Sequence, residues 1–212
     1  MKIKRDFYLR RLVEAKGDGF VKILTGIRRC GKSYLLFNLF KEHLLRDGVR
    51  RENIVEIALD KKKDAKLRSP DALYDFLTRR TARKRGRVYV FIDEVQECRR
   101  PKGAGRETAE EKAEREQQFY DILNEFRERK NIDLYVTGSN SRLLVTDVAT
   151  QFRGRGEPIQ INPLTFSEYY AAAGGDKPKA SIFTPAPLST TVFSLLQHLY
   201  DKIGRASCRE RV

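Results

Sequence analysis

Eight consecutive residues, from Gly26 to Ser33, have the types and spacing that bind a phosphate chain. They fit the pattern GxxxxGK[ST], the Walker A motif. Glycines let the backbone wrap so that its N–H groups point at a phosphate, and the helix that follows directs the positive end of its dipole to the same place. In such a loop Lys32 reaches the β- and γ-phosphates of ATP, and the Ser33 hydroxyl ligates Mg²⁺. The alternative is a glycine turn that merely ends a strand. We therefore predict an ATP-binding loop made of Gly26, Ile27, Arg28, Arg29, Cys30, Gly31, Lys32 and Ser33.

An acidic pair, Asp93 and Glu94, follows the apolar run from Val88 to Ile92. Ligands of open α/β sheets bind beyond the carboxyl ends of the strands, so this pair can face a bound nucleotide. Asp93 would hold Mg²⁺ directly or through water, as Walker B aspartates do. Glu94 would be the general base that orients and deprotonates the attacking water. The alternative is an acidic pair that complements the dipole at a helix N-terminus.

A third polar group, Thr137-Gly138-Ser139-Asn140, follows the apolar run 132–136. A polar amide at this strand end can touch the γ-phosphate and the attacking water. We predict that Asn140 has this catalytic role, with Ser139 as the second choice. The alternative is a plain turn, because Gly, Ser and Asn are ordinary turn residues.

Two arginines, Arg153 and Arg155, alternate with glycines further along the chain. Phosphoryl transfer spreads negative charge over the equatorial oxygens, and an arginine finger stabilises that charge. We predict Arg155 as the catalytic arginine and Arg153 as its alternative, while a basic turn explains the same residues equally well. The sequence leaves open whether this arginine acts on its own chain or on a neighbouring one.

Segments typical of strands and helices alternate around these residues. Apolar runs predict strands at 21–25, 54–59, 88–92 and 132–136, and the alternation around Ile159 and Ile161 predicts an edge strand. Helical spacing or start signals predict helices over 7–15 and 33–45, from Ser69, over 119–126 and from Thr165. Strands that alternate with helices imply an α/β fold with a parallel, doubly wound sheet.

The segment 99–118 differs from the rest because it is highly charged and has no apolar face. Thr108 and Glu111 form a capping box, so we expect a solvated helix in its second half.

The last ten residues, 203–212, can be written as ATC GGA AGA GCG TCG TGT AGG GAA AGA GTG, which resembles a common short-read sequencing adapter. We therefore expect a longer natural protein and exclude this segment from the fold. The alternative is an ordinary basic tail. The expected organisation is an ATPase core over 1–170 with a charged insertion at 99–118, an incomplete C-terminal segment 171–202, and the adapter-like segment 203–212.

The composition narrows the class of protein and its partners. A formal charge of +14 on 212 residues favours polyanions such as nucleotides or nucleic acid, although a solvated basic surface is an equal alternative. The basic clusters are Lys61 to Lys63 and the group Arg79, Arg80, Arg83, Lys84, Arg85 and Arg87. No run of 18 apolar residues exists, so no membrane span is expected. The three cysteines form no CxxC pair, which predicts reduced thiols and a cytoplasmic protein.

Four strings in the sequence resemble one family of bacterial and archaeal proteins. They are TGIRRCGKSYLLFNLF, VFIDEVQ, LYVTGSNSRLL and RGRGEPIQINPLTFSEYY, and the resemblance runs from about Ile3 to about Tyr170. The family is a group of AAA+-type P-loop ATPases that usually carry a C-terminal domain of unknown function. The resemblance implies an ASCE-type core with an extra strand between the Walker A and Walker B strands, here Ile54 to Leu59. It also supports the roles of Asn140 and Arg155.

The sequence departs from this family in two places. Segment 99–118 looks like an insertion, and from about Lys177 the chain no longer resembles the family. The predicted function is ATP binding and Mg²⁺-dependent ATP hydrolysis. The alternatives are a slow nucleotide-dependent switch that signals through a missing C-terminal domain, and a DNA-associated ATPase. The partners left open are a second copy of the chain, nucleic acid and an unknown protein.

Overall fold

The computed structural model describes residues 3–98, 108–138, 152 and 154–172. They fall into two units: the described residues of Asp6–Pro163 form one, and residues 3–5 with 164–172 belong to the other. In the second unit, α7 (Phe166–Ala172) begins where predicted. The Thr165 N–H donates to the Glu168 carboxylate and the Glu168 N–H donates to the Thr165 hydroxyl, which is the pattern of a capping box.

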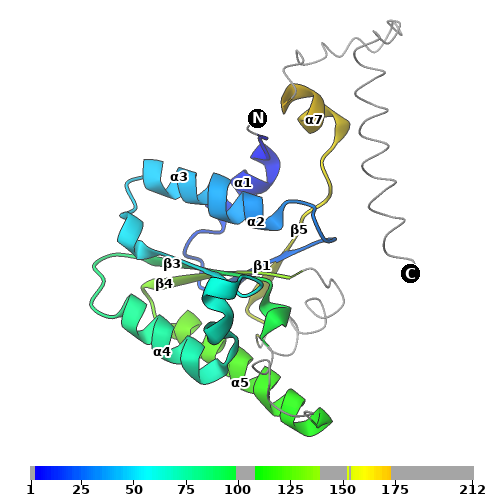
Figure 1. The fold of residues 1–212 in the computed structure, drawn as a ribbon. Coiled ribbons are helices and arrows are strands. Elements are labelled where there is room, and N and C mark those ends of the chain that lie inside the picture. Colours follow the sequence, from blue (N-terminus) through cyan, green and yellow to red (C-terminus); the bar gives the residue numbers. More distant parts are fainter. Residues whose placement is uncertain (1–2, 99–107, 139–151, 153, 173–212) are drawn as a thin grey trace, which may run out of the picture. The chain divides into compact units, whose positions relative to one another are not determined.

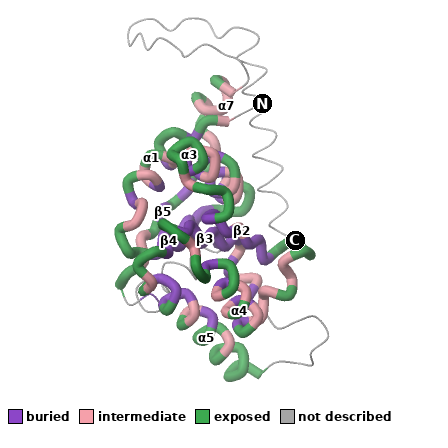
Figure 2. The backbone as a smooth tube through the Cα atoms, turned by 90° about the vertical axis from the view of Figure 1, so that its left-hand side faces the viewer, coloured by how far each residue is buried: buried purple, intermediate pink, exposed green. Residues whose placement is uncertain are grey.

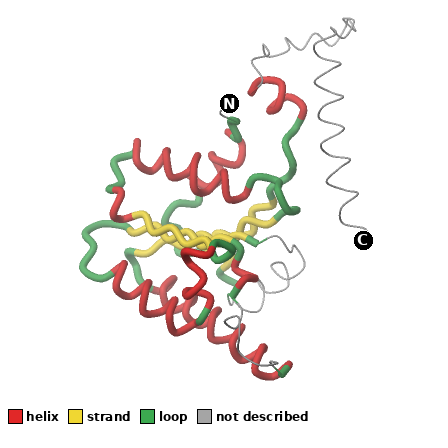
Figure 3. The backbone as a smooth tube through the Cα atoms, viewed as in Figure 1, coloured by secondary structure: helices red, strands yellow, loops and turns green. Residues whose placement is uncertain are grey.

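Five parallel strands form the sheet of the first unit, in the order β2-β3-β4-β1-β5 (Figure 3). Because every pairing is parallel, the carboxyl ends of all five strands lie at one edge. The predicted parallel α/β sheet is confirmed, and so is the edge position of the last strand. The strands are β1 (Val21–Thr25), β2 (Ile54–Ala58), β3 (Val88–Asp93), β4 (Ile132–Thr137) and β5 (Gly156–Gln160).

The expectation that the strand over 54–59 lies between the Walker A and Walker B strands is wrong for the order of strands in the sheet. The strand that separates β1 from β3 in the sheet is β4, whereas the strand predicted over 54–59 is β2 and lies at the edge. Residues 54–59 do come between the two Walker strands along the chain, but the chain passes from β2 directly to the adjacent β3. It then crosses through α5 (Ala109–Glu128) to place β4 beside β1. Strand order thus depends on these crossovers, not on the apolar runs themselves.

Helices cover both faces of the sheet, as Figure 1 shows. On one face α1 (Asp6–Glu14) and the helical stretch 32–46 pack on Leu24, Phe91 and Tyr135. On the other face α4 (Pro70–Thr81) and α5 pack on Ile23, Val90 and Val136. Neighbouring residues of a strand thus point to opposite faces and both are buried, which explains the continuous apolar runs. Short 3₁₀ helices, η2 (Arg51–Asn53), η3 (Lys62–Arg68) and η4 (Val95–Glu97), lie in the connections.

The helix predicted over 33–45 is continuous but not uniform. It consists of α2 (Lys32–Tyr34), the π-helical turn η1 (Leu35–Phe40) and α3 (Lys41–Arg46). All the apolar residues that predicted this helix are buried, namely Leu35, Leu36, Leu39, Phe40 and Leu44. Pairs five residues apart, such as Leu35 and Phe40, reach the same core because the π-helical turn is wider than an α-helical turn.

The first half of α5 is the solvated helix predicted within 99–118. Thr108 and Glu111 form the predicted capping box at its start, and Figure 2 shows this end of the helix as exposed. From Phe119 onward α5 returns to the core. No helix in the described part of the chain is long and apolar enough to cross a lipid bilayer.

Candidate functional site

The predicted phosphate loop connects β1 to α2 at the carboxyl edge of the sheet. It wraps around the side chain of Lys32, which is only 4% exposed. The Lys32 ammonium donates hydrogen bonds to the carbonyl oxygens of Gly26 at 2.9 Å and Ile27 at 3.0 Å. The loop therefore holds a cation at its centre, as a phosphate-binding loop requires.

Gly26 is required at the start of this loop for a steric reason. Its φ is +140°, and a Cβ there would lie 2.2 Å from the Ile161 carbonyl oxygen. The chain after β5 passes this close because the Ile161 N–H donates to the Thr25 carbonyl at 2.7 Å. Any larger residue would push the phosphate loop away from the end of β5.

Two strand ends and the phosphate loop meet at Asp93, the last residue of β3. The Ser33 hydroxyl donates to Asp93 Oδ1 at 2.9 Å, and the Thr137 hydroxyl donates to the same oxygen. Asp93 is 3% exposed. The structure thus brings together the two residues predicted to bind Mg²⁺.

Burial raises the pKa of the Asp93 carboxyl above its ordinary value, and the hydrogen bonds from Thr137 and Ser33 partly oppose this rise. The carboxylates of Glu94 and Asp60 raise it further. Negative charge is therefore concentrated at this end of the sheet, where a cation would relieve it.

Glu94 follows Asp93 in a strained backbone conformation with φ 56° and ψ 56°. Its N–H donates to the Thr137 hydroxyl at 3.1 Å, and its carboxylate accepts a hydrogen bond from Gln96. Left-handed conformations of non-glycine residues cluster at functional sites. The half-buried Glu94 carboxylate is thus held beside Asp93, where the sequence predicts a general base.

Arg155 lies at the amino end of β5, at the opposite edge of the sheet from the phosphate loop. Its carbonyl accepts from the Val21 N–H at 3.0 Å, and Gly156 pairs with Val21 at the start of β1. Five strand steps separate Arg155 from Gln160, the residue level with Thr25. These steps span roughly 16 Å at 3.3 Å per residue. The exposed Arg155 side chain therefore cannot reach a nucleotide in its own phosphate loop.

Three of the predicted site residues, Ser139, Asn140 and Arg153, lie outside the described residues.

The match to a family model decides the class of this protein. Residues 18–170 match the model of a family described as AAA domain. The chain belongs to this family. The AAA+-type P-loop ATPase fold expected from the four strings is thereby confirmed, and with it a nucleotide-binding class of protein.

Two curated relatives of this AAA domain protein are uncharacterized. The Haemophilus influenzae relative is 28% identical over 174 residues, which cover 82% of this chain and 39% of that protein. The Methanocaldococcus jannaschii relative is 26% identical over 156 residues, which cover 70% of this chain and 28% of that protein. The chain thus spans less than two fifths of the length of either relative.

Solved structures share the fold of this AAA domain. The Orc1 protein of Aeropyrum pernix in complex with DNA has a TM-score of 0.50 and 16% identity, over 81% of this chain and 48% of that chain. A chain of the HORMA:CdnC:Trip13 complex of E. coli MS115-1 has a TM-score of 0.57 and 11% identity, over 92% of this chain and 73% of that chain. At these identities the likeness concerns the fold alone.

Thr137 belongs to this site of the AAA domain, although the sequence pattern assigns it no role. It is the fully buried last residue of β4, and its hydroxyl contacts both Asp93 and the Glu94 N–H. A threonine that ends an apolar strand was the available signal. The sequence pattern favours Asn140, three residues later, because the position of β4 beside β3 is visible only in the fold.

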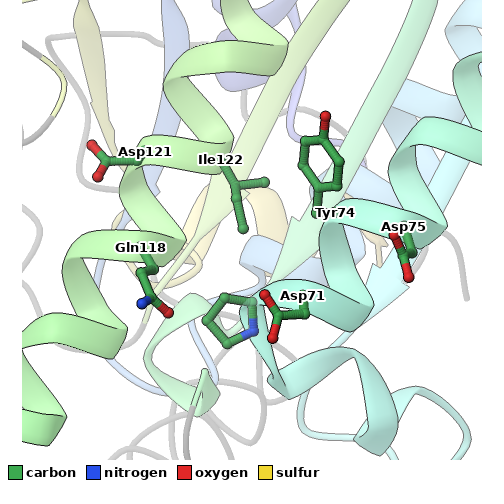
Figure 4. Close-up of a pocket in the computed structure, with 7 residues that line it drawn as sticks. Asp71, Tyr74, Asp75, Gln118, Asp121 and Ile122 are labelled. Carbon is green, nitrogen blue, oxygen red and sulfur yellow. The ribbon is translucent and has the colours of Figure 1, made fainter.

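Two hollows on the AAA domain differ in their relation to the site. One of about 330 Å³ borders the phosphate loop and is lined by Ser33, Tyr34, Phe37, Asn38, Glu56, Ala58, Lys61 and Lys63. The other, of about 320 Å³, lies between α4 and α5 and is lined by Pro70, Asp71, Tyr74, Asp75, Gln118, Asp121 and Ile122. Figure 4 shows the aspartates of the second hollow around its apolar side chains. Its acidic lining is unsuited to phosphates, whereas the first hollow includes Ser33 of the phosphate loop.

Proposed function

We propose that the chain binds ATP and hydrolyses it with Mg²⁺. The observation that carries the proposal is the 2.9 Å contact between the Ser33 hydroxyl and Asp93 Oδ1. It joins the phosphate loop to the acidic end of β3, as a shared metal site requires. The AAA domain family supports the nucleotide-binding class to which this activity belongs.

The residues around Asp93 fit Mg²⁺. This ion binds oxygen ligands at 2.0–2.1 Å in octahedral geometry, in which neighbouring ligand oxygens lie about 2.9 Å apart. The separation of the Ser33 and Asp93 oxygens equals this spacing, so both can serve as ligands, with Asp93 acting directly or through water. The ion would neutralise charge on the phosphates. Lys32 and the backbone N–H groups of the loop would hold the β- and γ-phosphates.

Glu94 would orient the attacking water and accept its proton. Its side chain follows Asp93 directly, and its backbone is fixed by Thr137. A base in this position contributes through both its location and its proton affinity. The predicted role of Asn140 on the γ-phosphate remains part of the same proposal.

Arg155 would complete the active site of a neighbouring copy of the chain. Arg155 is exposed at the amino edge of the sheet, where its side chain is too far from a nucleotide bound by the same chain. An arginine at such a surface can stabilise transition-state charge only in trans. The proposed active enzyme is therefore a homo-oligomer.

Steady-state ATP hydrolysis with Mg²⁺ or with EDTA tests this function. We expect hydrolysis only with Mg²⁺, and a higher Mg²⁺ requirement for Ser33→Ala. Ser69→Ala is the matched control, because the Ser69 hydroxyl makes no helix-capping bond at the start of α4. Tight ATP binding without turnover would show that the protein is a nucleotide-dependent switch and not a hydrolase. Absence of both binding and turnover would contradict the proposal.

A further inference from the structure

The amino edge of the sheet, opposite the nucleotide site, carries a dense group of arginines. It lies at the left of Figure 1, where the chain leaves α4 and enters β3. We call this group the arginine edge. It consists of five exposed residues within a stretch of nine, Arg79, Arg80, Arg83, Arg85 and Arg87.

The positive charge of the arginine edge is not neutralised by nearby acids. The nearby Glu52 is paired with Arg50 at 3.1 Å and Lys84 at 3.8 Å. Asp47 is paired with Lys16 at 2.6 Å. Within the described residues, none of the five side chains of the arginine edge has a carboxylate within ion-pair distance. Arginine stays charged at any physiological pH, so the repulsion among these groups persists until an anion binds.

A hollow of about 230 Å³ adjoins this surface, and Arg50, Arg85, Arg87 and the lysine-paired Asp47 are in its lining. Arg50 is held there because its guanidinium donates to the Arg85 carbonyl at 2.9 Å. Arg87 is held against Gly17, where a Cβ would meet its Nη1 at 1.1 Å. The position of the Arg87 charge is thus partly fixed, which lowers the entropic cost of binding an anion.

The rim of the hollow is open to a large ligand. Gly48 and Gly86 both lie in its lining. A Cβ on Gly48 would meet nothing within 4 Å, and one on Gly86 would meet only the Asn53 amide at 3.7 Å. An extended backbone can therefore approach without a clash.

Backbone strain marks Arg83 as more than a surface residue. Arg83 follows the last residues of α4 with φ 55°, at a position where helices usually have glycine. Among the described residues, only three that are not glycine have positive φ. The other two, Arg29 and Glu94, belong to the nucleotide site. Arg83 thus places a charge at the end of α4 where glycine would be free of strain.

We propose that the arginine edge binds the phosphate backbone of nucleic acid. Several arginines in a row match the charge spacing of a polynucleotide better than that of a single small anion. The aromatic residue in the hollow, Tyr89, is buried, so no platform for base stacking is offered there. Contacts to phosphates carry no sequence information, so binding is independent of base sequence and strongly dependent on salt. Because the surface lies at the opposite edge from the phosphate loop, it operates whether or not ATP is hydrolysed.

Fluorescence anisotropy with labelled duplex DNA of mixed sequence tests the proposal, without nucleotide or metal and over a series of salt concentrations. The variant is Arg80→Gln/Arg83→Gly/Arg85→Gln, which keeps the Arg85 carbonyl and gives the helix end its usual glycine. We expect an unchanged or higher melting temperature. The affinity should fall at least about tenfold. The slope of log affinity against log salt should fall by about one per arginine removed.

The matched control is Lys62→Gln/Lys66→Gln/Lys112→Gln, which removes the same charge from exposed lysines in η3 and at the start of α5, outside both the arginine edge and the lining of the first hollow. We expect it to retain most of the affinity, as should Arg80→Lys/Arg83→Lys/Arg85→Lys. Equal losses of DNA affinity in the arginine variant and in the lysine-to-glutamine control would show attraction by net charge alone and would overturn the proposal. It would also be overturned if the arginine variant bound DNA normally. Displacement of the DNA by polyglutamate as effective as by unlabelled DNA would assign the surface to an acidic protein instead.

Discussion

Asp93 places a carboxyl group where water is excluded and two hydroxyl groups donate to one of its oxygens. Its raised pKa means that folding disfavours the ionised form. Below the ordinary aspartate pKa, near 4, the group is neutral in the folded and the unfolded chain, and stability is unaffected. As the pH rises through the folded-state pKa, the folded chain loses stability relative to the unfolded chain, which ionises earlier.

Asp93→Asn should remove this pH-dependent loss. In buffer with EDTA, the melting temperature of Asp93→Asn should rise relative to that of the wild type as the pH increases from about 4. Other carboxyl groups titrate in both proteins, so the difference isolates Asp93. A difference that stays constant with pH would contradict the raised pKa. The same variant should lose the stabilisation that Mg²⁺ and ATP together give the wild type.

Glu94→Gln should separate binding from catalysis. The amide keeps the size of the side chain but cannot accept the proton of the attacking water, so turnover should fall by roughly 10²–10⁴-fold. ATP affinity, measured by equilibrium titration, should be nearly unchanged. Glu97→Gln, three residues later in η4, serves as control for the loss of one negative charge. Wild-type turnover in Glu94→Gln would show that another group is the base.

At the scale of elements, β1 and β4 are joined by a buried ion pair. Lys22 is fully buried, and its ammonium lies 2.6 Å from both Asp133 and Asp18. Asp133 also accepts from the Gly17 N–H at 2.9 Å and the Tyr135 hydroxyl at 3.0 Å. This network fixes β1, and with it the phosphate loop, against the strand that carries Thr137.

Breaking the pair from one side should be costly. Asp133→Leu leaves Lys22 with only Asp18, so we expect a loss of about 3–5 kcal/mol of unfolding free energy. The double variant Lys22→Met/Asp133→Leu removes the unpaired charge and should be more stable than the single variant. Denaturant titrations of both proteins measure this difference. A single variant as stable as the wild type would show that the pair contributes nothing.

The elements were largely predictable because continuous apolar runs identify strands that are buried on both faces. The order of the strands in the sheet was not predictable. The crossover that places β4 beside β1 does not change the pattern of apolar residues in the sequence. The apolar run 21–25 includes Lys22, because nothing local reveals that its ammonium pairs with Asp133 of the neighbouring strand. In the site, Gly26 to Ser33 and Asp93 follow from spacing, whereas the contact of Thr137 depends on the register between β3 and β4.

At the scale of the whole molecule, the two edges of the sheet have different chemistry. Lys32, Ser33 and Asp93 lie where the strands end. Arg155 and the five residues of the arginine edge lie where the strands begin. An active site that needs groups from both edges requires two copies of the chain. The chain covers 39% of one curated relative and 28% of another, so the assembly of those longer proteins is a separate question.

Action of Arg155 in trans predicts that turnover per molecule rises with protein concentration. Arg155→Ala should lower turnover by roughly 10³-fold or more with ATP affinity nearly unchanged. Mixing Arg155→Ala with Lys32→Ala protein should restore activity, since one copy supplies an intact phosphate loop and the other an intact arginine. Arg11→Ala, on α1, is a control for the loss of one positive charge. Turnover that is independent of concentration, without recovery in the mixture, would exclude the role in trans.

The central claim is that residues 26–33 and Asp93 form one site for Mg²⁺ and ATP. Equilibrium titration with a fluorescent ATP analogue, with Mg²⁺ and with EDTA, tests it most directly. The wild type should bind tightly and more strongly with Mg²⁺, and Lys32→Ala should lose tight binding because the loop loses its central cation. Lys130→Ala, which removes an exposed lysine in the turn before β4, should bind like the wild type. Unchanged affinity of Lys32→Ala would contradict the account.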